Sequence, residues 1–91
     1  MVNSNKDFFI KNLNLEIGGF IRKVRVENGL TGAQLGKLVG VSQQQISRYE
    51  RGSNEISLSY FIFILSMMDV QFSDFASYSS FFNETNSIVM I

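Results

Sequence analysis

Three glutamines, a serine and an arginine between residues 43 and 48 are the side chains best suited to recognition chemistry. Gln44 and Arg48 are four residues apart and Gln44 and Ser47 are three apart, so on a helix all three share one face. A glutamine amide can bond adenine through two atoms, and an arginine can bond guanine likewise, each pair giving about 1–3 kcal/mol of discrimination. The alternative is a polar helix face that contacts only solvent.

Catalytic and metal-binding chemistry has few candidate residues. The chain contains no cysteine and no histidine, which excludes thiolate and imidazole ligands, disulfides and the usual general base. Serines without a histidine or a suitably placed lysine do not form a nucleophilic site. We therefore expect a protein that is not an enzyme and that binds neither a metal nor a cofactor.

Glycines divide the chain into short segments that can position residues 43–48. Breaks fall at Gly29, Gly40 and Gly52, and there is no proline. Apolar residues recur at helical spacing between these breaks, which predicts several short helices. The expected helices cover residues 15–28, 32–38, 43–51, 58–68 and 73–79.

Capping patterns support these boundaries. Thr31 is followed three residues later by Gln34, and Ser42 by Gln45, as in the capping box. Simple N-caps for the last two helices are Ser57 and Ser73. A short helix, a connection through Gly40 and a second, capped helix form a helix-turn-helix. The inner faces of this motif are expected to contribute core residues, namely Leu35, Leu38, Val41 and Ile46.

The run Ile-Ser-Arg-Tyr-Glu-Arg-Gly at residues 46–52 follows Gly-Val-Ser at residues 40–42 at a fixed distance. Together with Leu-Thr-Gly-Ala-Gln-Leu at residues 30–35, it resembles the Cro/C1-type helix-turn-helix family of phage repressors and bacterial regulators. With the flanking helices the resemblance covers about residues 15–75. Residues 43–52 also resemble regulators encoded in fimbrial operons.

The resemblance implies an all-α fold, a compact five-helix domain of the lambda-repressor type. Residues 15–79 would form this DNA-binding domain, after an N-terminal arm at 1–14 and before an aromatic C-terminal tail at 80–91 that is a possible dimerisation element. By the same resemblance, an ion pair between Arg25 and Glu50 would fix the angle of the recognition helix.

The resemblance also assigns DNA contacts. Base-reading positions match Gln43, Gln44, Ser47 and Arg48. Phosphate contacts are expected near helix starts and after the recognition helix, at Thr31, Gln34, Ser42, Arg51, Ser53 and Asn54. The chain departs from the family pattern at Gly32, where a glutamine is usual, at Gly36, where an alanine is usual, and near Ile56, where a proline is common. These departures affect the expected affinity more than the fold.

Charge is unevenly distributed along a chain whose formal net charge is zero. Residues 15–55 carry six basic and four acidic side chains, a net of +2, whereas residues 56–91 carry three acidic side chains and no basic ones, a net of −3. The basic half can face DNA phosphates. Ordinary surface charge is an equally good explanation.

The segment 58–68 is apolar on nearly all sides, although a surface helix of a small protein should have a polar face. The aromatic tail, a second copy of the chain, or both must cover it. The expected homodimer interface is Phe61, Ile64, Leu65, Met68, Phe72, Phe75, Phe81 and Phe82. Residues 87–91 have a strand-like composition, and a disordered terminus is the alternative.

These features together favour a cytoplasmic transcriptional regulator that binds a palindromic operator in duplex DNA as a homodimer. There is no apolar signal-peptide core and no run long enough to span a membrane. The alternative function is an antitoxin-like or other protein-interaction module, with weak or secondary DNA binding and a protein partner.

Overall fold

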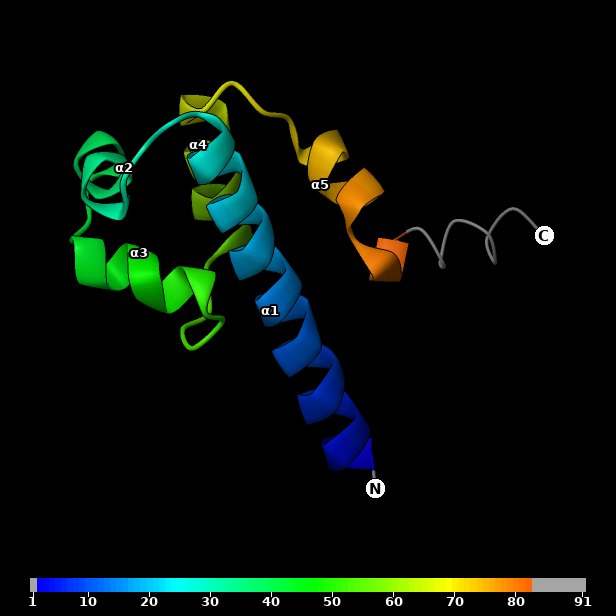
Figure 1. Cartoon of the computed structure of the whole chain (residues 1–91). Helices are drawn as coiled ribbons and strands as arrows, with labels where there is room; N and C mark the ends of the chain where they lie inside the picture. The colour runs from blue at the N-terminus through cyan, green and yellow to red at the C-terminus, as the bar shows by residue number, and fades with distance from the viewer. Residues whose placement is uncertain (1, 83–91) are drawn as a thin grey trace.

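The computed structural model describes residues 2–82, and side chains from residue 5 onward. Five α-helices are α1 (Val2–Glu27), α2 (Gly32–Val39), α3 (Gln43–Glu50), α4 (Leu58–Met67) and α5 (Phe72–Tyr78), and residues 80–82 are helical as well. Figure 1 shows α1 running the length of the molecule, with α2 and α3 on one side and α5 on the other. The predicted all-α fold is confirmed, and all five expected helices are present.

The largest difference from the expected boundaries is the start of α1. It begins at Val2 rather than at residue 15, so the segment 1–14, expected as an arm, is helical from Val2 onward. Ile10 and Leu13 continue the inner apolar stripe of Ile17 and Ile21 at steps of three and four. No glycine or proline precedes Gly18 to end the helix. Its N-terminal half projects beyond the other helices (Figure 1).

The expected caps of α2, α3 and α4 are present. Thr31 Oγ1 accepts from the Gln34 N–H at 3.0 Å, and Gln34 Oε1 accepts from the Thr31 N–H at 2.8 Å, which completes a capping box. Ser42 Oγ accepts from the N–H of Gln45, as a simple N-cap rather than the expected capping box, and Ser57 caps α4.

The expected cap of α5, Ser73, is wrong. The helix begins at Phe72, and the Asp74 carboxylate accepts from the Gln71 N–H at 3.0 Å. A carboxylate in the first helical turn also interacts favourably with the helix dipole, so Gln71 and Asp74, rather than Ser73, mark the start of α5.

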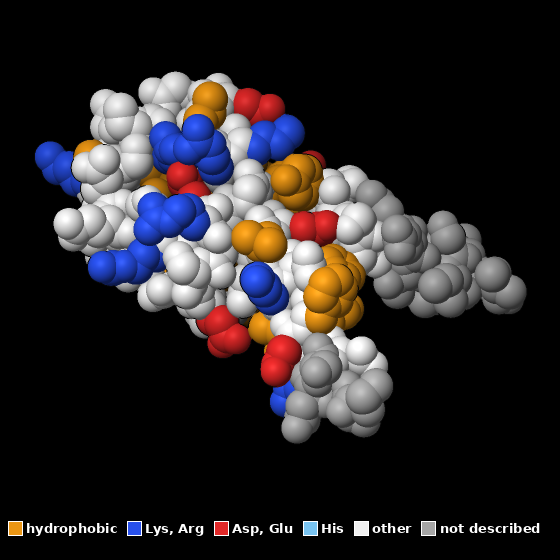
Figure 2. Space-filling view, turned by 60° about the horizontal axis from the view of Figure 1, so that its bottom comes forward, with side chains coloured by type: hydrophobic (Ala, Val, Ile, Leu, Met, Phe, Trp, Pro, Cys, Tyr) orange, Lys and Arg blue, Asp and Glu red, His pale blue; other side chains and the backbone are white. Residues whose placement is uncertain are grey.

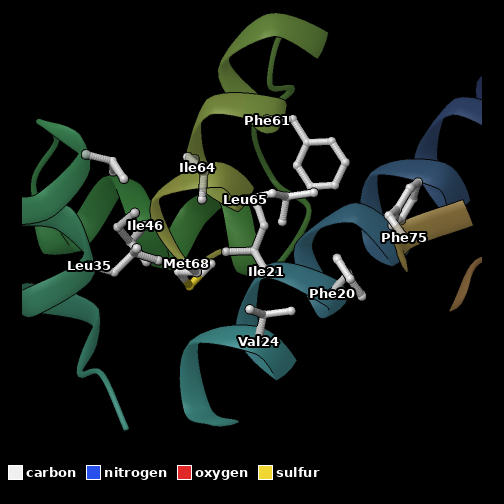
Figure 3. Packing of buried hydrophobic residues seen from close by; sticks show 11 residues of the cluster. Phe20, Ile21, Val24, Leu35, Ile46, Phe61, Ile64, Leu65, Met68 and Phe75 are labelled. Atoms are coloured by element: carbon white, nitrogen blue, oxygen red, sulfur yellow. The ribbon is translucent and has the colours of Figure 1, made fainter. Parts of the chain in front are cut away.

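All five helices contribute to one hydrophobic core, seen in close-up in Figure 3. Leu35 from α2 and Ile46 from α3 are 0% and 1% exposed, as expected, and Val41 packs partly buried against them. The prediction for Leu38 is wrong, because it is 43% exposed. Helix α2 turns Leu35 and Val39, four residues apart, toward the core, which leaves Leu38 on the outer side.

The expected dimer interface is largely inside the subunit. Five of its eight residues are at most 5% exposed and belong to the core, namely Phe61, Ile64, Leu65, Met68 and Phe75. Phe72 and Phe82 are partly buried against that core, and Phe81 is also partly buried. These side chains are therefore not a free surface for a partner.

The cover for α4 comes from α5 of the same chain. The rings of Phe72 and Phe75 lie 6.2 Å and 5.1 Å from that of Phe61, both edge to face. The opposite side of α4 stays exposed at Leu58, Ile62, Phe63 and Met67. Of the two expected covers, the aromatic segment of the same chain is thus present on one side of α4, and a cover from a second copy stays a prediction.

The chain after α5 is fastened to α1. Ser79, which is fully buried, and Ser80 both donate hydroxyl hydrogen bonds to the Glu16 carboxylate. Burial raises the pKa of Glu16, but the hydrogen bonds from Ser79 and Ser80 outweigh it, so that the pKa lies below the ordinary glutamate value. A ring contact at 4.7 Å between Phe9 and Phe81 extends this attachment. The prediction made for residues 87–91, a strand or a disordered terminus, falls outside the described residues.

Candidate nucleic-acid interface

The turn between α2 and α3 is tight because of two glycines. Gly40 has a φ of 87°, in the left-handed region that glycine adopts without strain, and its N–H and that of Val41 both donate to the Gly36 carbonyl. A Cβ atom at Gly36 would lie 2.5 Å from the carbonyl oxygen of Val41. The alanine usual in the family would therefore not fit without a backbone shift.

Helix α3 also meets α1 at a glycine. A Cβ atom at Gly18 would lie 2.2 Å from the Tyr49 carbonyl oxygen and 2.6 Å from that of Glu50. The main chains of α1 and of the end of α3 are therefore in direct contact. Sequence reasoning missed Gly18. The available signal was a glycine pair, Gly18-Gly19, inside a helical apolar pattern, where each glycine costs about 1 kcal/mol relative to alanine.

Arg25 and Glu50, the expected ion pair, lie in contact beside this crossing. Arg25 Nε donates to Glu50 Oε2 at 2.6 Å and Nη2 donates to Oε1 at 3.0 Å. The side chains are only 12% and 8% exposed. Arg25 Nη1 also donates to the Leu30 carbonyl at 2.9 Å. The hydrogen bond to Glu50 raises the pKa of Arg25 against the opposing effect of burial.

The outer face of α3 carries the expected base-reading residues. Gln43, Gln44 and Arg48 are exposed and Ser47 is partly exposed, while Ile46 on the opposite side is buried. Ser47 Oγ accepts a hydrogen bond from Arg51 Nη1, so these two side chains lie next to each other on the helix surface. Figure 2 shows Lys and Arg side chains gathered at one end of the molecule, with acidic atoms among them. A protruding helix with amide and guanidinium groups on its free side can hydrogen-bond the edges of bases.

The six expected phosphate contacts are all exposed, but several already have partners. Gln34 Oε1 and Thr31 Oγ1 are used in the capping box of α2, and Ser53 Oγ donates to the Arg48 carbonyl at 3.1 Å. Ser42 caps α3 and lies directly before its reading face, whereas Arg51, Ser53 and Asn54 follow its end. The structure thus places these residues at both ends of α3 and at the start of α2.

Gly32, where the family usually has a glutamine, lies next to the start of α3. The nearest atom to a Cβ built at Gly32 would be Gln43 Cγ, at 3.6 Å. The stem of Gln43 therefore packs over the space above Gly32. The cap of α2 uses the Oε1 atom of Gln34, so the side-chain NH2 group can still donate to a phosphate as the missing glutamine would.

Other kinds of site have little support among the described residues. No three acidic side chains come close enough there to hold a metal ion. No single described helix is long and apolar enough to cross a membrane, although α4 and α5 together pass by length and composition as a pair bent by 102°.

Comparison with known proteins shows that residues 21–75 match a helix-turn-helix family. An uncharacterised HTH-type transcriptional regulator of Rickettsia conorii is 31% identical over 64 residues, which are 70% of this chain and 51% of the relative. One of Sinorhizobium medicae is 32% identical over 63 residues, which are 69% of this chain and 45% of the relative. The chain thus spans about half the length of the curated relatives that it matches.

Proposed function

The chain belongs to the helix-turn-helix family, and from that membership we propose that it is a transcriptional regulator that reads duplex DNA sequence-specifically with α3. The observation that carries the proposal is the two-sided character of α3. Ile46 anchors the helix in the core, while Gln44 and Arg48 extend from its free side. The narrower relation to fimbrial-operon regulators stays a prediction.

In the proposed complex α3 lies in the major groove. Gln43 and Gln44 donate to and accept from adenine edges, and Arg48 donates to guanine. Ser47 and Arg51 are hydrogen-bonded to each other, so Arg51 approaches the backbone next to the base that Ser47 faces. Phosphates lie at the start of α2 and at both ends of α3, where backbone N–H groups and side-chain donors are exposed.

We infer further that the protein binds as a homodimer on a palindromic site in the cytoplasm. With a net charge of zero, one copy has little non-specific attraction to phosphate. Two linked copies gain affinity because the second half-site is bound at high effective concentration. Two recognition helices about 34 Å apart would match half-sites roughly 10 base pairs apart.

The test is selection of bound duplexes from a random library with the wild-type protein, Gln44→Ala and Arg48→Ala. We expect the wild type to enrich a palindrome, and each variant to lose preference at one position per half-site while its circular dichroism spectrum is unchanged. Lys37→Ala, which removes an exposed charge of α2 outside the assigned site, is the matched control and should keep the sequence preference.

Two outcomes would contradict the proposal. Unchanged preference in both variants would mean that the outer face of α3 contacts only solvent. The absence of any enriched sequence would instead favour a protein-interaction module of the antitoxin type.

A further inference from the structure

The side of α1 that faces away from the core carries apolar residues at the spacing of a helix-packing seam. We call the positions along this side the outer seam. They recur at alternating steps of four and three residues, at Phe8, Asn12, Leu15, Gly19, Arg22 and Val26, of which three are large and apolar. The three large apolar members are 71%, 45% and 57% exposed in chain order. Such a stripe, opposite the buried Phe20, Ile21 and Val24, is the pattern by which one helix packs on another.

The outer seam is complementary to itself when two copies run antiparallel. With Leu15 of one copy opposite Gly19 of the other, Phe8 falls opposite Val26 and Asn12 opposite Arg22, since each pair of numbers adds to 34. At the centre the large Leu15 thus meets Gly19, and at the ends the apolar Phe8 meets the apolar Val26. A depression lined by Gly19, Val26 and the neighbouring Arg22, Lys23 and Glu27 lies along the half of the seam that would face Phe8, Asn12 and Leu15 of the second copy. Figure 2 shows hydrophobic side chains exposed on the same face as the basic group.

We propose that the outer seam is the homodimer interface and that its occupant is α1 of a second copy, antiparallel and in this register. A symmetric dimer needs a self-complementary patch. The seam provides one over 18 residue steps, roughly 27 Å of helix. Gly19 has no side chain at the middle of the contact, and the Tyr78 hydroxyl borders this point, 3.1 Å from the position of a Cβ atom.

The positions of α3 and α5 around α1 determine where the two recognition helices lie in this dimer, an inference that rests on the proposed function. Helix α3 contacts α1 at Gly18, while the end of α5 lies against Glu16 and Gly19 on the other flank. In an antiparallel pair the two-fold axis passes midway between the helices and is perpendicular to the plane that contains both helix axes. It therefore runs from the α5 flank to the α3 flank of each copy. Both copies of α3 therefore lie on one side of the dimer, as binding to two half-sites of one duplex requires.

The same register predicts how salt affects self-association. Lys11 of one copy comes next to Arg22 of the other on the α3 flank, and both side chains are exposed. Because these like charges repel and salt screens the repulsion, the dimer should tighten as salt increases in the absence of DNA. Weaker self-association at higher salt would contradict the register.

Sedimentation of the full chain without DNA tests the interface. Phe8→Glu should raise the dimer dissociation constant at least about a hundredfold, because the symmetric contact is lost twice per dimer. Phe8 lies outside the core, so the circular dichroism spectrum should not change. The matched control is Ile62→Glu, the same kind of change at the exposed side of α4, which should dimerise like the wild type. A monomeric wild type, or loss of the dimer in Ile62→Glu alone, would overturn the proposal.

Cysteine cross-linking tests the register separately, because the chain has no cysteine of its own. The double variant Asn12→Cys, Arg22→Cys should form disulfide-linked dimers under mild oxidation. Within one helix these positions are about 15 Å apart, too far for an internal disulfide. Neither single variant should cross-link efficiently. Efficient cross-linking of the single variants would indicate a parallel pair and overturn the proposal.

These outcomes are separable from those of the proposed function. A dimer of the predicted register with no DNA preference would uphold the interface and refute DNA reading. A wild-type protein that selects a DNA sequence but sediments as a monomer would do the opposite.

Discussion

Removal of either Arg25 or Glu50 should destabilise the domain strongly, and the two losses should not add. The pair is joined by two charge-assisted hydrogen bonds and is nearly buried. Loss of one partner from such a pair costs about 3–5 kcal/mol when the other charge is left without compensation. Arg25→Ala should lie at the lower end of this range, because Arg22 Nη1 is 4.0 Å from Glu50 Oε1 and partly compensates that carboxylate. The double variant Arg25→Ala, Glu50→Ala should therefore lose much less than the sum of the single variants. We expect a coupling free energy of about 2–4 kcal/mol.

The assay is urea unfolding followed by circular dichroism. A 91-residue domain has a total stability of roughly 5–14 kcal/mol, so a single variant can be close to unfolded. If so, all four proteins are compared in the same concentration of a stabilising osmolyte, which strengthens folding without altering the pair. The slope of the free energy with urea should be the same in all four proteins.

The chain provides a matched control in Lys23 and Glu27, an ion pair with a distance of 2.8 Å whose side chains are 51% and 58% exposed. A cycle on this pair should give a coupling below about 0.5 kcal/mol, as exposed pairs on helices do. Additive losses for Arg25 and Glu50, or equal couplings for the two pairs, would refute the view that the buried pair ties α1 to α3.

Three further predictions concern close packing and the attachment of α5. Gly18→Ala should lower the free energy of unfolding by about 2 kcal/mol or more in urea titration, since the clash with the Tyr49 carbonyl exceeds the helix-propensity gain of about 1 kcal/mol. Gly36→Ala should also lower the free energy of unfolding. Gly32→Ala is the control and should not lower it, because a Cβ atom there would have only ordinary contacts. A Gly36→Ala variant as stable as the wild type would contradict the tight turn. Because the folded pKa of Glu16 is lowered, the stability that its ionised form contributes is present above pH 4.5 and is lost as the pH falls through the folded pKa. Stability measured from pH 6 to about pH 3 should thus depend less on pH in Glu16→Gln than in the wild type, and identical pH slopes would show that Ser79 and Ser80 do not stabilise the carboxylate.

Local signals predict the helix-turn-helix well. Glycines, capping residues and apolar spacing are properties of neighbouring residues, so the bounds of α2 and α3 differ from expectation by one residue at most. The family resemblance also rests on this part of the chain and is confirmed. The exposure of Gln44 and Arg48 agrees with their positions on α3 relative to Ile46, but their role as base readers remains a prediction.

Contacts between distant segments are harder to predict. Whether the apolar residues of α4 face a second copy or α5 depends on how Phe72 and Phe75 fold back, which no local pattern specifies. Gly18 shows the same limit, because a glycine in a helix becomes informative only when the neighbouring backbone is known. The N-terminal extension of α1 escapes prediction because asparagines at 3, 5 and 12 are weak helix formers, although Ile10 and Leu13 are partly buried.

The backbone contact at Gly18 makes α1 a rigid lever attached to the recognition helix. Main-chain atoms cannot change rotamer, so a tilt of α3 passes directly into α1 rather than being absorbed by side chains. From Gly18 to Val2 the helix extends roughly 24 Å, and a tilt of about 10° would displace its far end by roughly 4 Å over that length. A fluorophore or spin label near residue 5 would therefore report the angle of α3 from a position distant from the proposed DNA contacts.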